Sequence, residues 1–115
     1  MPRGRFTPYV RDYPIPRPIT RDATLAAIAR GDYHAAAGGN MRLCVAPATR
    51  FAVRGVLEFN DAMQAGYTGL FNAASNFDAS RGVQFSTYAS YWVRQAMRRE
   101  EMGGLLLSVP AYAFE

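Results

Sequence analysis

Apolar and aromatic residues recur with the period of an α-helix along most of the chain, and this periodicity constrains the fold more than any other feature. Its clearest instance starts at Phe85, where Tyr88, Trp92 and Gln95 follow at intervals of three, four and three residues and form one stripe. No segment alternates apolar and polar residues as a half-buried strand does. The 115 residues therefore predict one all-α domain, a compact bundle of four to five helices.

The first half of the predicted bundle is divided by capping and breaking residues. Thr20 can cap a short helix that ends at Gly31, with Leu25, Ile28 and Ala29 as its apolar stripe. Between residues 32 and 53 we expect a bent or interrupted helix. Pro47 either kinks it or starts a new one, because proline has no N–H to donate.

Two longer helices are predicted in the second half. Asn60 or Asp61 can cap the first, and a loop at 78–82 follows it. Ser86 or Thr87 can cap the second, which we expect to end near Met102, before two glycines.

Residues 1–19 contain five of the seven prolines, so we expect an extended basic arm rather than a helix. Six arginines against two aspartates occur by residue 30. The arm could lie along a phosphate backbone or be a solvated tail. The predicted organisation is an arm at 1–19, a helical domain at 20–104 and a further segment at 105–115.

All thirteen basic residues are arginine, and the formal net charge is +4. Guanidinium groups pair with phosphate and stack on flat rings, which favours a polyanionic partner, although the codon usage of a GC-rich genome is an equal explanation. Cys44 is the only cysteine, which excludes an intrachain disulfide and suits the cytoplasm. No apolar run approaches the length of a membrane span, so no membrane partner is expected.

Residues for catalysis or metal binding are sparse. His34 is the only histidine and has no second ligand nearby in sequence. Glu100 and Glu101 point apart on a helix, and Cys44 in its apolar setting is a packing residue. We therefore expect neither an enzyme nor a bound metal or cofactor.

A second stripe, formed by Tyr91, Arg94, Gln95 and Arg98, adjoins the aromatic one, and Val93, Ala96 and Met97 are left for packing. One interpretation is an aromatic core face beside a solvated arginine face. The other is a surface for single-stranded DNA, in which rings stack on bases and guanidiniums bind phosphates. Tyrosine and tryptophan carry polar groups that a dry core must satisfy, which favours the second.

The segment FDASRGVQFSTYASYWVRQAMRRE, residues 77–100, resembles regions 2.3 and 2.4 of housekeeping-type bacterial RNA polymerase sigma factors. Upstream, FNDAMQAGYTGLFNAASNFD is similar to region 2.2, GNMRLCVAPATRF to region 2.1 and ITRDATLAAIARGDYHAA to the end of region 1.2. VPAYAFE resembles the start of region 3. The resemblance covers roughly residues 19–115 and implies the fold of sigma factor domain 2.

The resemblance further implies a transcription initiation subunit that recognises and melts the −10 promoter element by capturing flipped non-template bases. Phe77, Asp78, Arg81, Phe85 and Tyr88 would form the pocket for a flipped adenine, and Asn40, Leu43 and Ser86 would accept a flipped thymine. Tyr91 and Trp92 would wedge against the duplex edge, and Gln95 and Arg98 would face the upstream base pair. Arg94 and Arg99 would hold phosphates, and Thr87 completes the DNA-binding set.

The other implied partner is core RNA polymerase, through the clamp coiled coil of its largest subunit. Its contacts match Asp61 and Gln64, with Ala65, Tyr67 and Phe71 on the same helix. Here Ala65 stands for the family's glutamate and Tyr67 for its asparagine. Tyr91, Val83 and Arg98 also depart from the family pattern, so the preferred promoter sequence is expected to differ.

These departures, together with the lack of counterparts of regions 3 and 4 after Glu115, predict a divergent sigma-like protein, phage- or mobile-element-encoded, or a fragment of one. The expected location is the cytoplasm of a bacterial or phage-infected cell. The alternative is a sigma mimic that occupies the polymerase clamp and inhibits or redirects host transcription. A helical domain whose aromatic residues are all core is the third possibility.

Overall fold

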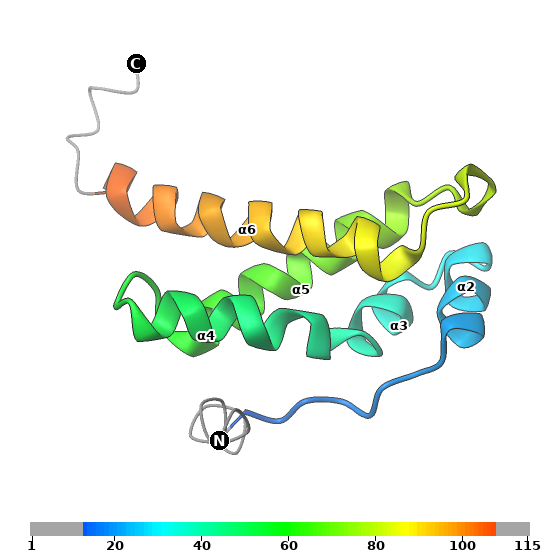
Figure 1. The fold of residues 1–115 in the computed structure, drawn as a ribbon, viewed down its shortest axis with the longest axis horizontal. Coiled ribbons are helices and arrows are strands. Elements are labelled where there is room, and N and C mark those ends of the chain that lie inside the picture. The colour runs from blue at the N-terminus through cyan, green and yellow to red at the C-terminus, as the bar shows by residue number, and fades with distance from the viewer. Residues whose placement is uncertain (1–12, 108–115) are drawn as a thin grey trace.

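The computed structural model describes residues 13–107, with side chains to residue 103, and its regular secondary structure is all helical (Figure 1). The predicted all-α class and the bundle of four to five helices are confirmed, and the described residues contain no strand. The α-helices are α2 (Arg21–Ala29), α3 (Tyr33–Gly38), α4 (Val45–Val53), α5 (Phe59–Asn76) and α6 (Phe85–Leu107). Two 3₁₀ turns, η1 (Met41–Cys44) and η2 (Ala79–Arg81), lie in the connections.

Helix α2 has the predicted ends. The Thr20 side chain accepts a hydrogen bond from the Ala23 N–H, and Gly31 follows the helix with φ +79°, a conformation that glycine adopts without strain. The predicted apolar stripe is confirmed only in part: Ile28 packs half-buried against the core, whereas Ala29 is exposed and the fully buried residues of α2 are Thr24 and Ala27.

The interrupted helix predicted for residues 32–53 is confirmed as α3, η1 and α4 in succession. Pro47 is the third residue of α4, where its missing N–H costs no helical hydrogen bond, so it belongs to the start of a new helix rather than to a kink.

The predicted starts of the two long helices were late. Helix α5 begins at Phe59, after the extended residue Glu58, rather than at a cap on Asn60 or Asp61. Helix α6 begins at Phe85, so Ser86 and Thr87 lie inside its first turn. It also continues through Gly103 and Gly104 to Leu107. Residues 1–12 and 108–115, which include most of the predicted arm and the VPAYAFE segment, lie outside the described residues.

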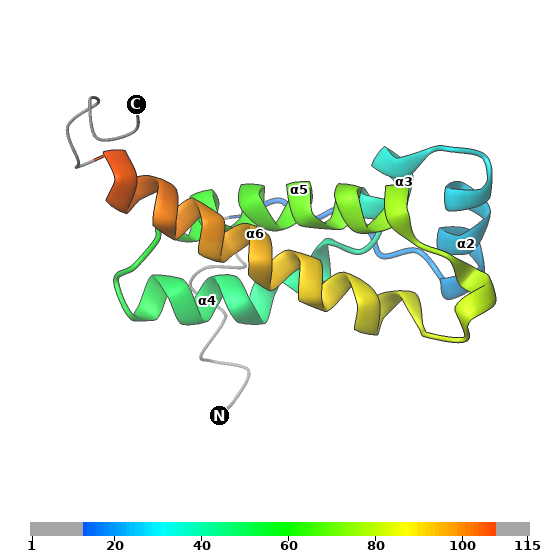
Figure 2. The ribbon, with the colours of Figure 1, turned by 90° about the horizontal axis from the view of Figure 1, so that it is seen from above.

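Helices α5 and α6 form the centre of the fold, where α6 packs obliquely across α5 (Figure 2). Gly69 makes the crossing close, since a Cβ built there would lie 2.6 Å from the Trp92 carbonyl oxygen. A Cβ built at Gly66 would likewise lie 2.6 Å from the Cys44 Sγ. The largest fully buried side chains gather at this crossing: Met63, Leu70, Met97, Val93 and Cys44.

The described part of the N-terminal arm packs on the bundle rather than extending from it. Tyr13 makes an edge-on contact with Phe59, with ring centroids 5.7 Å apart, and Ile15 is half-buried against the core. The Ile19 N–H donates to the Gly39 carbonyl at 3.1 Å. Within residues 13–107, no helix is both long enough and apolar enough to cross a membrane.

Candidate nucleic-acid interface

The buried face of α6 is a stripe with a four-residue interval, formed by Phe85, Ala89, Val93 and Met97. Val93 and Met97 confirm the predicted packing positions, whereas Ala96 is only half-buried. Phe85 is 4% exposed and belongs to this core face. Its ring can therefore support an aromatic surface from below but does not lie on it.

A row of aromatic rings runs from the end of α5 along α6. Phe77 packs edge-on against Phe85 with centroids 5.3 Å apart, and lies 5.4 Å from Tyr88. Tyr88 in turn lies 6.0 Å from Trp92. Phe77, Tyr88 and Trp92 are half-buried, so each has part of its ring in contact with solvent. The Tyr88 hydroxyl donates to the Asn76 carbonyl at 3.3 Å, which links α6 to the end of α5.

The loop between α5 and α6 holds a carboxylate beside this row. Asp78 Oδ1 accepts from the Ser80 hydroxyl at 2.6 Å and from the Ser80 N–H at 3.0 Å. These bonds, with a smaller contribution from the Arg81 charge, lower the pKa of the Asp78 carboxyl. Gly82 reverses the chain with φ +78°. Asp78 is therefore a charged acceptor at neutral pH, and both it and Arg81 are exposed.

A small cavity of about 160 Å³ opens between α2, the start of η1 and the start of α6. Asn40 is fixed in its wall, because its amide NH₂ donates to the Ala36 carbonyl at 2.7 Å and to Thr24 Oγ1 at 3.0 Å. The Thr24 hydroxyl itself donates a hydrogen bond to the Thr20 carbonyl at 3.0 Å. This chain of bonds leaves the Asn40 carbonyl oxygen as an acceptor without a protein partner among the described residues. The lining residues are Arg21, Thr24, Asn40, Gln84, Phe85 and Ser86.

The cavity brings together two of the three residues that the resemblance assigned to a flipped thymine. Asn40 and Ser86 line it, whereas Leu43, which is half-buried, does not. The sequence did not single out Arg21, Thr24 or Gln84 for this place. A cap residue such as Thr20 locates a helix start, but it does not show which face of α2 turns toward α6.

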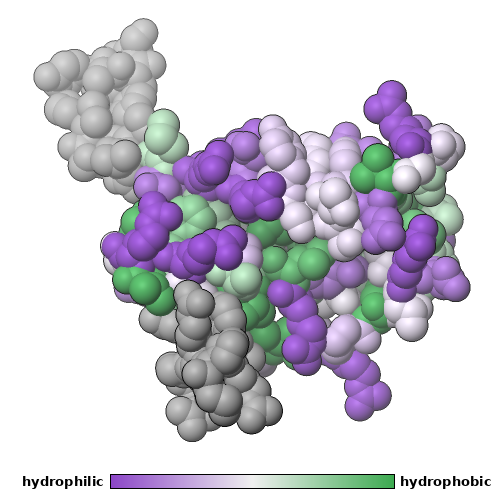
Figure 3. All heavy atoms as spheres, in the orientation of Figure 1, coloured by the Kyte–Doolittle hydropathy of each residue, from purple (hydrophilic) through white to green (hydrophobic). Residues whose placement is uncertain are grey.

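Beyond Trp92, the outer face of α6 is basic. Tyr91 is 57% exposed, and Arg94, Arg98 and Arg99 are exposed as well, while Gln95 is half-buried. Figure 3 shows hydrophobic groups between α6 and α4, flanked by hydrophilic groups. Tyr91 is thus the one large aromatic residue of the described chain that projects most of its side chain into solvent.

The residues predicted to bind polymerase lie on α5 with differing exposure. Asp61 and Gln64 are exposed, Tyr67 and Phe71 are half-buried, and Ala65 is 9% exposed and packs in the core.

Tyr67 and Phe71 join an aromatic cluster with α3 that the sequence did not indicate. The Tyr67 hydroxyl and His34 Nδ1 are hydrogen-bonded at 2.7 Å, and the two rings stack with centroids 6.1 Å apart. The His34 ring also lies 4.7 Å from Phe71, and Tyr33 packs edge-on against Phe71 at 5.8 Å. The described residues include no group of histidine, cysteine, aspartate or glutamate placed to hold a metal ion.

Comparisons with known proteins identify the family. The family described as Sigma-70 region 2 matches residues 39–100. The proteins named RNA polymerase sigma factor SigA of Listeria monocytogenes and of Listeria innocua are each 42% identical over 87 residues, which cover 70% of this chain and 23% of the relative. SigA of Lactococcus lactis is 46% identical over 63 residues, 55% of this chain and 17% of its own. The chain thus spans about a quarter or less of the length of these relatives.

Proposed function

The chain belongs to the Sigma-70 region 2 family, and on that premise we propose that it acts as a non-enzymatic transcription initiation subunit that binds core RNA polymerase and recognises and melts the −10 promoter element. The observation that carries the proposal is the row of half-exposed rings beside exposed arginines on α6. Rings and guanidiniums in one surface are what single-stranded DNA requires, since bases stack on the rings and phosphates pair with the cations.

Capture of a flipped adenine is assigned to the start of this row. The Phe77 and Tyr88 rings lie 5.4 Å apart, and Phe85 packs edge-on against Phe77 from the core. Asp78 stays ionised at neutral pH and can accept a hydrogen bond from the exocyclic amine of adenine, which thymine lacks. Removing a base from the stack costs a few kcal/mol, and a preformed aromatic pocket offsets that cost.

Capture of the second base, a thymine, is assigned to the cavity of about 160 Å³. The Asn40 carbonyl oxygen is held by the two bonds of its own amide, so it faces a ligand as an acceptor only. Thymine offers an N–H on its pairing edge, whereas cytosine has an unprotonated nitrogen at the same position. Ser86 and Gln84 in the same wall can pair with the thymine carbonyls.

Separation of the duplex is assigned to Tyr91 and Trp92, at the end of the ring row. Tyr91 projects into solvent, and Trp92 is half-buried against Tyr88. The last base pair of the duplex can stack on these two rings. Gln95 and Arg98 lie one to two turns further along α6 and would face the upstream base pair, with Arg94 and Arg99 on phosphates. Binding to the polymerase clamp is assigned to the exposed Asp61 and Gln64 on α5, together with Tyr67 and Phe71.

The test measures binding of the complex with core polymerase to single-stranded DNA that contains TATAAT or a scrambled sequence. Tyr88→Ala should weaken binding to TATAAT by about 1–3 kcal/mol, or roughly 5- to 150-fold, because a stacking partner is lost. Tyr88→Phe is the matched control: it keeps the ring, removes only the bond to Asn76, and should bind nearly as tightly. Equal affinity of the native complex for both sequences would refute the proposal.

A second candidate function follows from the altered polymerase surface. This surface differs from the family pattern at Ala65 and Tyr67. Ala65 is buried, and the Tyr67 hydroxyl is hydrogen-bonded to His34. A protein that occupies the clamp without opening promoters would inhibit or redirect transcription. Run-off transcription with purified core separates the two functions, since transcripts from a template with only a −10 element support initiation and inhibition alone supports the mimic.

A further inference from the structure

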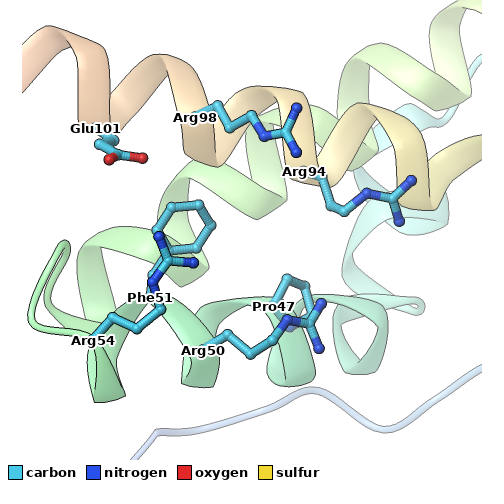
Figure 4. Close-up of a pocket in the computed structure, with 7 residues that line it drawn as sticks. All are labelled: Pro47, Arg50, Phe51, Arg54, Arg94, Arg98 and Glu101. Atoms are coloured by element: carbon cyan, nitrogen blue, oxygen red, sulfur yellow. The ribbon is translucent and has the colours of Figure 1, made fainter.

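A groove of about 200 Å³ runs between α4 and α6, beyond the aromatic row. Figure 4 shows two arginines on each side of it: Arg50 on α4 and Arg54 at the C-terminal cap of α4 on one side, and Arg94 and Arg98 on α6 on the other. Pro47 and Phe51 supply the apolar wall, and Glu101 lies at one end. The family resemblance assigned roles to the two arginines of α6 but none to those of α4.

Helical spacing brings the four guanidiniums together. In each helix the two arginines are four residues apart, so they share one face about 6 Å apart along the axis. Like charges at this spacing repel and destabilise a helix, and here two such pairs face each other across one groove. The arrangement is unfavourable for the isolated fold, and an anionic ligand in the groove would relieve it.

The protein itself does little to neutralise this charge. The one ion pair among the described residues joins Arg30 to Asp32, on another part of the surface. Glu101 lines the groove but no arginine nitrogen lies within ion-pair distance of it. All four arginines are exposed, so their guanidiniums are accessible to a ligand.

The lining favours phosphates over bases as the ligand. Arginine binds phosphate oxygens through two parallel N–H groups, and a run of arginines suits a run of phosphates. The one ring in the wall, Phe51, is covered by the Arg54 guanidinium at 5.9 Å from its centroid, so it is not free to stack on a base. This composition contrasts with the ring row on the same helix, where half-exposed rings are available.

We propose that the α4–α6 groove binds the sugar–phosphate backbone of duplex DNA, with Arg50 and Arg54 as contacts that extend the interface from α6 onto α4. Its position, from about half a turn to about two and a half turns past Trp92, rests on the proposed function, because that is the side on which unmelted duplex would lie. The phosphate chemistry of the groove rests on the four arginines alone.

The test uses the full chain without polymerase and a duplex oligonucleotide that contains no −10 sequence, with affinity measured by fluorescence anisotropy as salt is raised from about 50 to about 200 mM. The slope of log affinity against log salt should fall by about 1.8 in Arg50→Gln/Arg54→Gln, about 0.9 for each lost phosphate contact. The matched control is Arg30→Gln/Arg42→Gln, which removes the same charge from exposed positions outside the groove and should keep most of the slope.

Glu101→Gln is a second variant, and it removes the only carboxylate among the lining residues. It should tighten duplex binding severalfold, whereas misfolding would weaken binding. An unchanged slope in Arg50→Gln/Arg54→Gln, or an equal loss in the control pair, would overturn the assignment. The proposed function is read separately, from the preference of the polymerase complex for single-stranded TATAAT. The groove variant should retain that preference, so either idea can fail without the other.

Discussion

Asn40 illustrates how one side chain can be fixed by its neighbours before any ligand arrives. Its amide NH₂ donates to Ala36 of α3 and Thr24 of α2, so it joins two helices, and the residue lines the cavity with its carbonyl oxygen not hydrogen-bonded to the protein. The same side chain thus contributes to the stability of the fold and to the proposed recognition of a base.

Asn40→Asp should lower the free energy of unfolding by about 1–3 kcal/mol, because two acceptors lose their donor and a carboxylate replaces it. Chemical denaturation monitored by circular dichroism measures the change. Asn76→Asp is the control, since Asn76 also donates to a backbone carbonyl, at 2.8 Å, but is exposed and can be replaced by water. A similar loss in both variants would show that the Asn40 bonds have no special role.

Cys44 is fully buried, and burial raises the pKa of its thiol from 9.0 to about 12. The folded chain therefore holds the thiol proton more tightly than the unfolded chain does. This stabilisation is complete below pH 9 and is lost as pH rises toward 12, with a slope of about 1.4 kcal/mol per pH unit.

Comparison of the native chain with Cys44→Ala by urea unfolding between pH 8 and pH 11 tests this, and only the native chain should show the additional slope. The pKa of Tyr13 is also raised, first by burial, which both chains share, and then by the nearby Cys44, so the difference between the two curves reports the thiol together with its charge interaction with Tyr13. Parallel curves would contradict the prediction.

Among the elements, the crossing of α5 and α6 depends on a glycine that a helix would otherwise disfavour. A Cβ at Gly69 would meet the backbone of Trp92 and Val93, which cannot rotate away as a side chain can. Gly69→Ala should therefore lower the free energy of unfolding by about 1–3 kcal/mol, despite a gain in helix propensity of about 1 kcal/mol.

Gly103→Ala is the matched control, because Gly103 also lies in a long helix but nothing surrounds its Cβ position within 4 Å. There the propensity gain is unopposed, and stability should rise by up to about 1 kcal/mol. Thermal unfolding of both variants measures the two changes in stability. Stabilisation by Gly69→Ala would contradict the prediction, because it would mean that α5 and α6 can move apart without an energetic cost.

The sequence predicted the helical elements well and their ends less well, for physical reasons. Caps such as Thr20 act locally, so α2 begins where its sequence indicates. Phe59 and Phe85 start their helices early because tertiary packing holds them in the core, at 8% and 4% exposure. The two glycines after Met102 have helix-breaking propensity, yet α6 continues through them to Leu107.

Helical spacing alone could predict the candidate site only where it follows one helix, and the grouping of Asn40 with Ser86 came from the family resemblance. The ring and arginine stripes of α6 are visible in the spacing alone, but local spacing does not show what α2, α3 and α4 bring beside them. The cavity around Asn40, the His34–Tyr67 pair and the α4 arginines all join helices far apart in sequence. Predicting them requires knowing which faces of the helices meet.

At the scale of the whole molecule, the packing of α5 on α6 separates the two proposed partners. The buried residues of α5 are apolar side chains and two glycines, whereas Asp61 and Gln64 on the same helix are exposed. DNA is assigned to the outer face of α6 and polymerase to the outer face of α5. The closely packed core between them would hold promoter bases at a fixed position relative to the polymerase.

This separation predicts that Asp61→Ala weakens binding to core polymerase by about tenfold, or about 1.4 kcal/mol. Once the complex is assembled at a higher polymerase concentration, it should still bind single-stranded DNA. The control is Asp22→Ala. Asp22 is also an exposed aspartate in the first turn of a helix, so both variants lose the same favourable interaction with the helix dipole. Titration of labelled chain with core polymerase, followed by titration of the complex with DNA, measures both affinities. If Asp61→Ala lowers DNA affinity in the saturated complex as much as it lowers polymerase affinity, the two surfaces are not independent and the division of α5 and α6 between partners is wrong.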